Sequence, residues 1–145
     1  MYTKILIATD GSPLSVRAVE HGVALAKAVG ASVCFVTVTD RFHIFSFETE
    51  QLEATRGTFR KEMREQAVRR FTDAVRIAEA QGVPFTKVHL EEDEPYLGIL
   101  STAERQGCDL IVMASHGRSG VSALLLGSET TKVLTHSKIP VLVVR

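Results

Sequence analysis

The sequence predicts an α/β fold in which an open, twisted, parallel sheet of about five strands carries helices on both faces. Short apolar runs alternate along the chain with longer segments whose apolar residues recur at helical spacing. The apolar runs are nearly continuous, which is typical of strands that are buried on both faces. Each segment between two runs is long enough for the crossover that joins parallel strands.

The composition predicts one globular domain. The chain has 145 residues, and we expect a single domain over residues 1–145. Hydrophobic residues make up 45% and charged residues 23%, and the net charge is zero, which favours neither nucleic acid nor an anionic membrane as a partner. No apolar run approaches the roughly 20 residues of a membrane span, and the run before Asp10 is too short for the core of a signal peptide. We therefore expect a cytoplasmic protein.

The beginning of the chain predicts a strand, a helix and a second strand. Residues 4–8 are a short apolar run and form the first expected strand. Ser12 can cap a helix, Pro13 suits its first position, and Gly30 is expected to end it. Residues 32–38 are apolar again and form the second expected strand.

The next stretch, residues 41–58, has no clear period. Its aromatic residues are Phe42, Phe45 and Phe47. It is either a loop whose aromatic side chains fold back onto the domain, or a lid or partner surface. Residues 59–80 then show a helical stripe of apolar residues, and Arg69 and Arg70 are expected on the solvent face of this helix.

The rest of the chain predicts three strands and two helices. Residues 85–90 are comparatively polar, which suits a sheet edge. The acidic residues 91–94 could serve acid–base chemistry, but directly before Pro95 they more often favour a helix N-terminus electrostatically. The expected elements are a helix over residues 95–106 that Gly107 ends, a strand over 110–113, a helix over 129–137 and a strand over 139–144.

The two cysteines, Cys34 and Cys108, have no C-x-x-C spacing and no cluster of histidines near them. We expect two unpaired thiols, one buried and one at the edge of a loop. If the first strand lies between them, they are about 10 Å apart, which is too far for a disulfide.

The stretch from Leu110 to Ser128 combines a buried strand, a loop of glycine and small residues, and the start of a helix. Glycine lets the backbone approach an anion, and the first turn of a helix leaves amide groups unpaired. Asp10 ends the first strand and would face this loop across a crevice if the first and fourth strands are neighbours. These residues alone predict an anion-binding crevice.

Each residue of this crevice also has a simpler interpretation. Asp10 could instead order the turn that follows it. Arg118 could be a solvated charge rather than a phosphate partner, and His116 could merely pack within the loop. Ser128 is expected to be the N-cap of the last helix, which is compatible with phosphate binding by the amides behind it.

Residues 114–128 resemble the nucleotide-binding signature of the universal stress protein family, in which Gly, two residues, Gly, nine residues and Gly precede Ser or Thr. This chain has Ala114 in place of the first glycine, followed by Gly117, Gly127 and Ser128 at the family's spacing. The resemblance covers the whole chain, from its first strand to its last. It implies a Rossmann-like fold of the adenine nucleotide alpha hydrolase type with strand order 3-2-1-4-5. It also implies a homodimer and, in the ATP-binding branch of the family, an ATP site.

The resemblance implies in addition which residues would line that site. Ala8, Thr9 and Asp10 would lie near the ribose and phosphates, Val38 would pack on adenine, and Met113 and Ala114 would line the sugar and base. The phosphates would meet the backbone amides of Gly117, Arg118, Gly127, Ser128 and Glu129. ATP is the expected ligand, with Mg²⁺ or ribose hydroxyls to offset the repulsion between Asp10 and a polyphosphate.

Three functions are compatible with these residues. The first is a nucleotide-binding regulatory protein of the stress response whose output is conformational. The second is an enzyme, but the chain has no G-x-x-x-x-G-K-[ST], no G-x-G-x-x-G after the first strand, and no second glycine to complete G-x-S-x-G at Ser119. We therefore assign no catalytic residue and no metal ligand, and expect slow ATP hydrolysis at most. The third is a family member that binds no ATP and acts through protein contacts, which Ala114 keeps open.

Residues Val141 to Val144 form a continuous apolar run after Pro140, and the strand order above places this run at a sheet edge. A bare apolar edge invites aggregation unless it is covered. We expect a homodimer in which this strand pairs with the same strand of a second copy.

Overall fold

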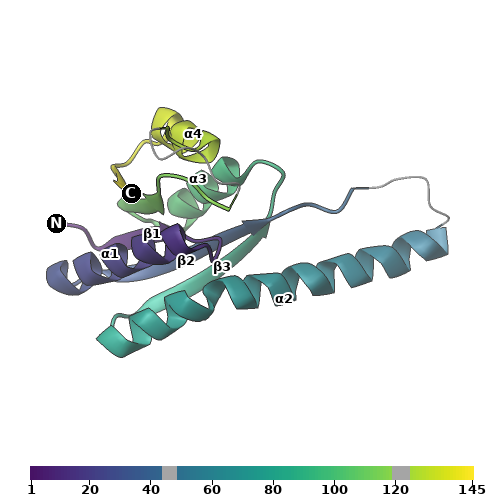
Figure 1. Cartoon of the computed structure of the whole chain (residues 1–145), viewed down its shortest axis with the longest axis horizontal. Helices are drawn as coiled ribbons and strands as arrows, with labels where there is room; N and C mark the ends of the chain where they lie inside the picture. Colours follow the sequence, from purple (N-terminus) through teal and green to yellow (C-terminus); the bar gives the residue numbers. More distant parts are fainter. Residues whose placement is uncertain (44–48, 119–124) are drawn as a thin grey trace.

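Five parallel strands form one sheet in the order β3-β2-β1-β4-β5 in the computed structural model, which describes residues 1–43, 49–118 and 125–145 (Figure 1). The strands are β1 (Lys4–Ala8), β2 (Ser32–Thr39), β3 (Phe85–Glu91), β4 (Leu110–Ala114) and β5 (Val141–Val144). The helices are α1 (Pro13–Val29), α2 (Thr49–Gln81), α3 (Pro95–Gln106) and α4 (Ser128–His136). The predicted fold class and strand order are confirmed.

Helices cover both faces of the sheet, with α1 and α2 on one face and α3 and α4 on the other (Figure 1). Successive residues of a strand point to opposite faces. Ile7 and Phe35 therefore lie in the core under α1 and α2, whereas Leu6 and Val36 lie in the core under α3. Because both cores are closed, the buried residues of β1 and β4 form continuous apolar runs, Ile5–Ile7 and Leu110–Ala114, and this is the pattern that made the strands recognisable.

Helix α1 begins and ends at the residues that were predicted to cap it. The Ser12 side chain accepts a hydrogen bond from the Ser15 amide, Pro13 opens the helix, and Gly30 ends it in the left-handed conformation at φ 74°. A side chain on Gly22 would collide with Ile7, so this glycine lets α1 lie close to the sheet. The start of α1, and hence the turn that follows β1, is fixed on the sheet.

Helix α2 begins earlier than predicted. Residues 49–58 were expected to belong to a loop or lid, but they form the first part of a 33-residue helix that extends beyond the sheet (Figure 1). The buried stripe of α2 starts only at Ala67, so the earlier turns carry no periodic apolar signal. Phe42 packs against Phe59 with ring centroids 5.5 Å apart, as expected for an aromatic residue that folds back. Phe45 and Phe47 lie outside the described residues.

The other boundaries differ from the prediction by one or two residues. Strands β2, β3 and β4 each extend one residue further, α4 lies one residue earlier, and β5 starts at Val141. Cys34 and Cys108 are free thiols, as expected, but both are buried in the core under α3 and their side chains interact, so the expected separation of about 10 Å was wrong. Within the described ranges, no helix is long and apolar enough to cross a membrane.

Candidate functional site

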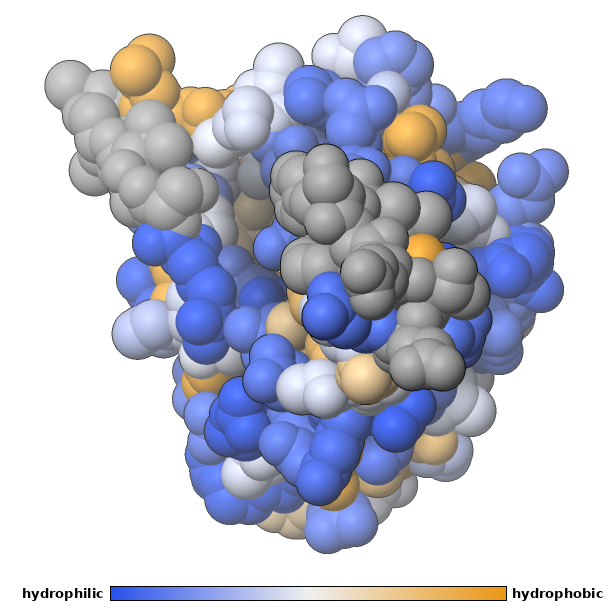
Figure 2. Space-filling view, turned by 90° about the vertical axis from the view of Figure 1, so that its right-hand side faces the viewer, coloured by the Kyte–Doolittle hydropathy of each residue, from blue (hydrophilic) through white to orange (hydrophobic). Residues whose placement is uncertain are grey.

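A cavity of about 630 Å³ opens at the carboxyl ends of β1, β2 and β4. Figure 2 looks onto this end of the molecule, where apolar surface lies in a recess among hydrophilic side chains. Strand order reverses between β1 and β4, and open α/β sheets bind ligands at that point. Every residue that the resemblance assigned to a nucleotide site lines this cavity. They are Ala8, Thr9, Asp10, Val38, Met113, Ala114, Gly117, Arg118, Gly127, Ser128 and Glu129.

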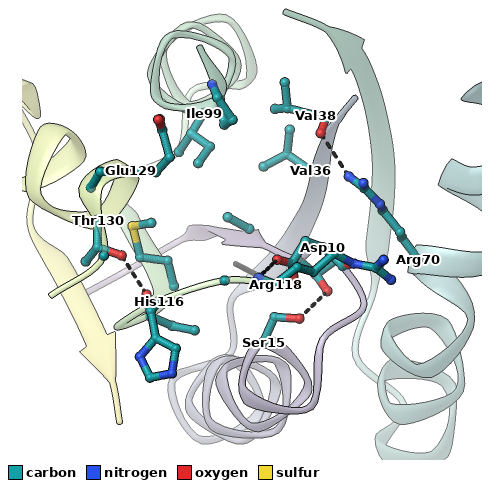
Figure 3. A pocket seen from close by; sticks show the side chains of 18 of the residues that line it. Asp10, Ser15, Val36, Val38, Arg70, Ile99, His116, Arg118, Glu129 and Thr130 are labelled. Carbon is teal, nitrogen blue, oxygen red and sulfur yellow. Dashed lines mark hydrogen bonds between the residues drawn. The ribbon is translucent and has the colours of Figure 1, made fainter. Parts of the chain in front are cut away.

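One end of the cavity is apolar. Val36 and Val38 from β2, Met113 from β4 and Ile99 from α3 line it, and all four belong to the side of the sheet that α3 covers. Figure 3 shows Val36, Val38 and Ile99 together at this end. Such walls suit a flat apolar ring, because the ring loses contact with water without leaving polar groups unpaired.

Asp10 lies at the centre of the site and is held by backbone amides. Its carboxylate accepts hydrogen bonds from the Ser12 amide at 2.9 Å and the Arg118 amide at 2.9 Å, and its own carbonyl accepts from the Arg118 Nε at 2.8 Å. Burial alone would raise the pKa of Asp10, but hydrogen bonds from Ser12, Ser15 and Arg118 outweigh it and hold the pKa below its ordinary value. Asp10 therefore orders the turn after β1, as one interpretation held, and also ties that turn to the loop after β4.

Two glycines let the loop after β4 approach its neighbours. A Cβ atom on Gly117 would lie 2.7 Å from the Asp10 carboxylate, and one on Gly127 would lie 3.0 Å from the backbone of His116. The Gly127 amide donates to the Ser115 carbonyl at 2.7 Å, which closes the loop beside the cavity. A side chain at either position would push the loop away from Asp10 or from α4.

The N-terminus of α4 forms the polar end of the cavity. Helix α4 starts at Ser128 and its N-cap is Gly127, so the prediction that Ser128 is the N-cap was wrong by one residue. The first intrahelical bond runs from the Thr131 amide to the Gly127 carbonyl, which leaves the preceding amides of the first turn without helical partners. The Thr130 hydroxyl donates to the Ala114 carbonyl at 2.9 Å and fixes α4 on β4 (Figure 3). A helix N-terminus held in this way presents free amides and a partial positive charge, which suit an anion.

The side chain of Glu129 binds the backbone at the start of α3. Its carboxylate accepts a hydrogen bond from the Tyr96 amide at 2.8 Å and lies 3.6 Å from the Lys132 ammonium group. The expectation for Glu129 concerned only its backbone amide, and nothing in the local sequence indicated that its side chain would cap a neighbouring helix. The acidic residues before Pro95 also have structural partners, since Glu92 pairs with Arg41 at 2.9 Å and the helix begins at Pro95.

Arg70 does not lie on the solvent face where it was predicted. Its Nη1 atom donates to the Val38 carbonyl at 2.9 Å, and the side chain lines the cavity, whereas its neighbour Arg69 is exposed. Arg70 stands at the margin of the buried stripe of α2, beside Phe71. A long side chain at such a margin can cover apolar surface with its stem and carry its charge to a polar edge.

Seven further residues line the cavity without having been assigned to it. They are Ser15, Val36, Asp40, Pro95, Ile99, His116 and Thr130. Val36 could have been found from strand periodicity, because it is two residues before Val38 and shares its face. Among the described residues, no group of three or more His, Cys, Asp or Glu side chains could hold a metal ion.

The universal stress protein family model matches residues 1–145, the whole chain. The chain belongs to the universal stress protein family. Universal stress protein MJ0531 of Methanocaldococcus jannaschii is 34% identical over 147 residues, and the alignment covers all of this chain and 83% of that protein. Universal stress protein YxiE of Bacillus subtilis is 31% identical over 149 residues, with both chains covered completely. The solved structure of MJ0577 from M. jannaschii superposes with a TM-score of 0.83 at 29% identity, covering 99% of this chain and 96% of its own.

This universal stress protein departs from the family signature at Ala114, and the structure shows where the extra methyl group goes. Strand β4 alternates, so Met113 joins the core under α3 while Ala114 joins the core under α1 and α2. Ala114 is buried there, in contact with apolar neighbours. The methyl group therefore packs on the side of the sheet opposite the apolar end of the cavity.

Proposed function

We propose that this universal stress protein is a cytoplasmic regulatory protein of the stress response that binds an adenine nucleotide in the cavity between Asp10 and α4. One observation carries the proposal. The apolar walls and the free amides at the start of α4 open onto the same cavity. A base would take the apolar end, the phosphates would take the amide end, and the carboxylate of Asp10 between them would accept ribose hydroxyls.

Two solved structures with this fold support an adenine nucleotide as the ligand. One is a universal stress protein in complex with cAMP, and the other is a universal stress protein from Archaeoglobus fulgidus in complex with dAMP. ATP is the form we propose here, because the first turn of α4 has several amides without helical partners, which offer donors to more than one phosphate. Mg²⁺ would accompany the phosphates and offset the repulsion between them and the carboxylate of Asp10, which lines the same cavity.

The proposed output is conformational, with slow hydrolysis at most. The glycine loop lacks the lysine with which a P-loop supports fast phosphoryl transfer. The alternative function, a family member that binds no nucleotide, rested on Ala114. Ala114 belongs to the core under α1 and α2 and also lines the cavity, so the melting experiment below decides between the two functions.

We expect ATP with Mg²⁺ to raise the melting temperature in a concentration-dependent way. A ligand that binds only the folded state stabilises it by about 2.7 kcal/mol at a hundred times its dissociation constant. For a domain of this size that corresponds to a shift of roughly 5–10 °C in a calorimetric or fluorescence melt. Inorganic triphosphate is the control, since it offers the anion without the base and should shift the melt much less. No shift at millimolar ATP would contradict nucleotide binding and favour action through protein contacts.

We also propose a homodimer through β5. This strand lies at the sheet edge, and Leu142 is 39% exposed there. Light scattering at micromolar concentration should give twice the chain mass of 15.9 kDa. Leu142→Lys should shift the mass to that of a monomer, because a charge on an edge strand opposes pairing. Val68→Lys is the matched control on α2, where the valine is 69% exposed, and should stay dimeric. A wild-type monomer would rule the dimer out.

A further inference from the structure

The carbonyl group of Val38 faces the crevice. Along β2, the backbone groups of odd-numbered residues point toward β3. The Val33 amide donates to the Pro84 carbonyl, and the Thr39 carbonyl accepts from the Glu92 amide. Even-numbered residues face β1 instead, and the Val36 carbonyl accepts from the Thr9 amide. Strand β1 ends at Ala8, so the next carbonyl on this side, that of Val38, extends past β1 into the open crevice.

Arg70 donates a hydrogen bond to this carbonyl group. Its Nη1 atom donates to the Val38 oxygen at 2.9 Å and lies 3.4 Å from the Thr37 hydroxyl. The backbone of α2 is fixed at this point, because a Cβ atom on Gly11 would lie 3.2 Å from the Arg70 Cα. The guanidinium group is therefore held at the rim of the apolar end by the packing of α2 on the turn after β1 (Figure 3).

Part of the guanidinium group has no hydrogen-bond partner among the described residues. This part is the Nε atom, which is buried. An arginine carries five donor hydrogens, and a buried donor without a partner destabilises the protein. Burial and the nearby charge of Arg118 lower the pKa of Arg70, while Asp10 and Asp40 oppose this. Because the side chain lines the cavity, the hydrogens on its terminal nitrogens are the donors that a ligand there can reach.

We infer that Arg70 is a ligand-recognition residue that donates a hydrogen bond to a ring nitrogen of the bound nucleobase. This inference rests on the proposed nucleotide site. Arg70 stands beside Val38, at the apolar end, whereas the start of α4, with the amides that suit phosphates, lies on the far side of the cavity (Figure 3). The Val38 oxygen has a second lone pair, so the rim presents an acceptor next to a donor. The edge of adenine presents the complementary pair, an amino group beside a ring nitrogen.

Isothermal titration calorimetry with ATP, 7-deaza-ATP and 1-deaza-ATP tests the inference, since each analogue lacks one ring acceptor. Wild-type protein should bind one of the two analogues about tenfold more weakly than ATP, because a hydrogen bond from a charged donor is lost. Arg70→Met, which keeps an unbranched apolar stem and removes every donor, should bind ATP about tenfold more weakly and should no longer distinguish that analogue from ATP. Arg69→Met, the same change on the exposed neighbour, should match wild type.

The results separate this inference from the function on which it rests. If wild-type protein binds ATP and both analogues equally, or if Arg70→Met binds ATP as wild type does, the role of Arg70 is wrong while the site stands. A loss for ATP in Arg70→Met that is absent for adenosine would place the guanidinium group on the phosphates, which also overturns the inference. If wild-type protein binds no ATP, the proposed function itself fails. Should Arg70→Met not fold, equal binding of ATP and both analogues by wild-type protein would still overturn the inference, and Arg70→Leu is the second variant without a donor.

Discussion

Replacing Phe35 with alanine is expected to lower the free energy of unfolding by about 3–5 kcal/mol. Phe35 is fully buried in β2 under α1 and α2, and its ring centroid lies 5.7 Å from that of Phe85. The change removes a ring from a closed core and leaves a cavity that rigid strands on both sides cannot fill. Because a domain is stable by only about 5–15 kcal/mol, this loss is large. Urea unfolding followed by circular dichroism measures it.

The same change at Phe59 is the control. Phe59 is half-buried on the part of α2 that extends beyond the sheet, where it packs against Phe42, and Phe59→Ala should cost about 1 kcal/mol or less. Side chains alternate along β2, so Phe35 points away from the cavity while Val36 and Val38 face it. Folded Phe35→Ala protein should therefore bind ATP as wild type does. Equal losses for the two variants would show that the core under α1 and α2 is not the main source of stability.

The fold could be predicted because its signals are local. Each strand is a short apolar run, and the ends of α1 and α3 are marked by residues such as Pro13, Gly30 and Gly107 whose effect on the backbone is intrinsic. The strand order followed from the family resemblance rather than from any run of residues. The start of α2 was missed because its first turns project from the sheet and bury no stripe.

The residues of the candidate site also differ in whether the local sequence reveals them. Asp10, Gly117 and Gly127 could be assigned because turn chemistry and glycine spacing are visible along the chain. The position of Arg70 depends on which β2 carbonyl extends beyond the end of β1, and this is a property of strand register. The capping of α3 by Glu129 depends on how two helices meet. Neither contact leaves a pattern in the local sequence.

Ser128→Pro is expected to weaken ATP binding about tenfold or more while leaving the fold intact. Ser128 is the first residue of α4, where proline is well tolerated because the amide has no helical partner. The residue before proline must be extended, and Gly127 already is, with φ −62° and ψ 154°. The substitution therefore removes one amide from the polar end of the cavity without disturbing the helix. A hydrogen bond from such an amide to a charged phosphate contributes about 1.5–3 kcal/mol.

Three measurements determine which group binds the phosphate. The melting temperature without nucleotide should stay within about 2 °C of wild type if the helix is intact. Ser128→Ala, which removes the hydroxyl and keeps the amide, should bind ATP more tightly than Ser128→Pro in calorimetry. Adenosine has no phosphate and should bind both variants as it binds wild type, the opposite of the pattern expected for Arg70→Met. If Ser128→Pro and wild type bind ATP equally, the phosphates do not lie at the N-terminus of α4, and the two ends of the cavity must be reassigned.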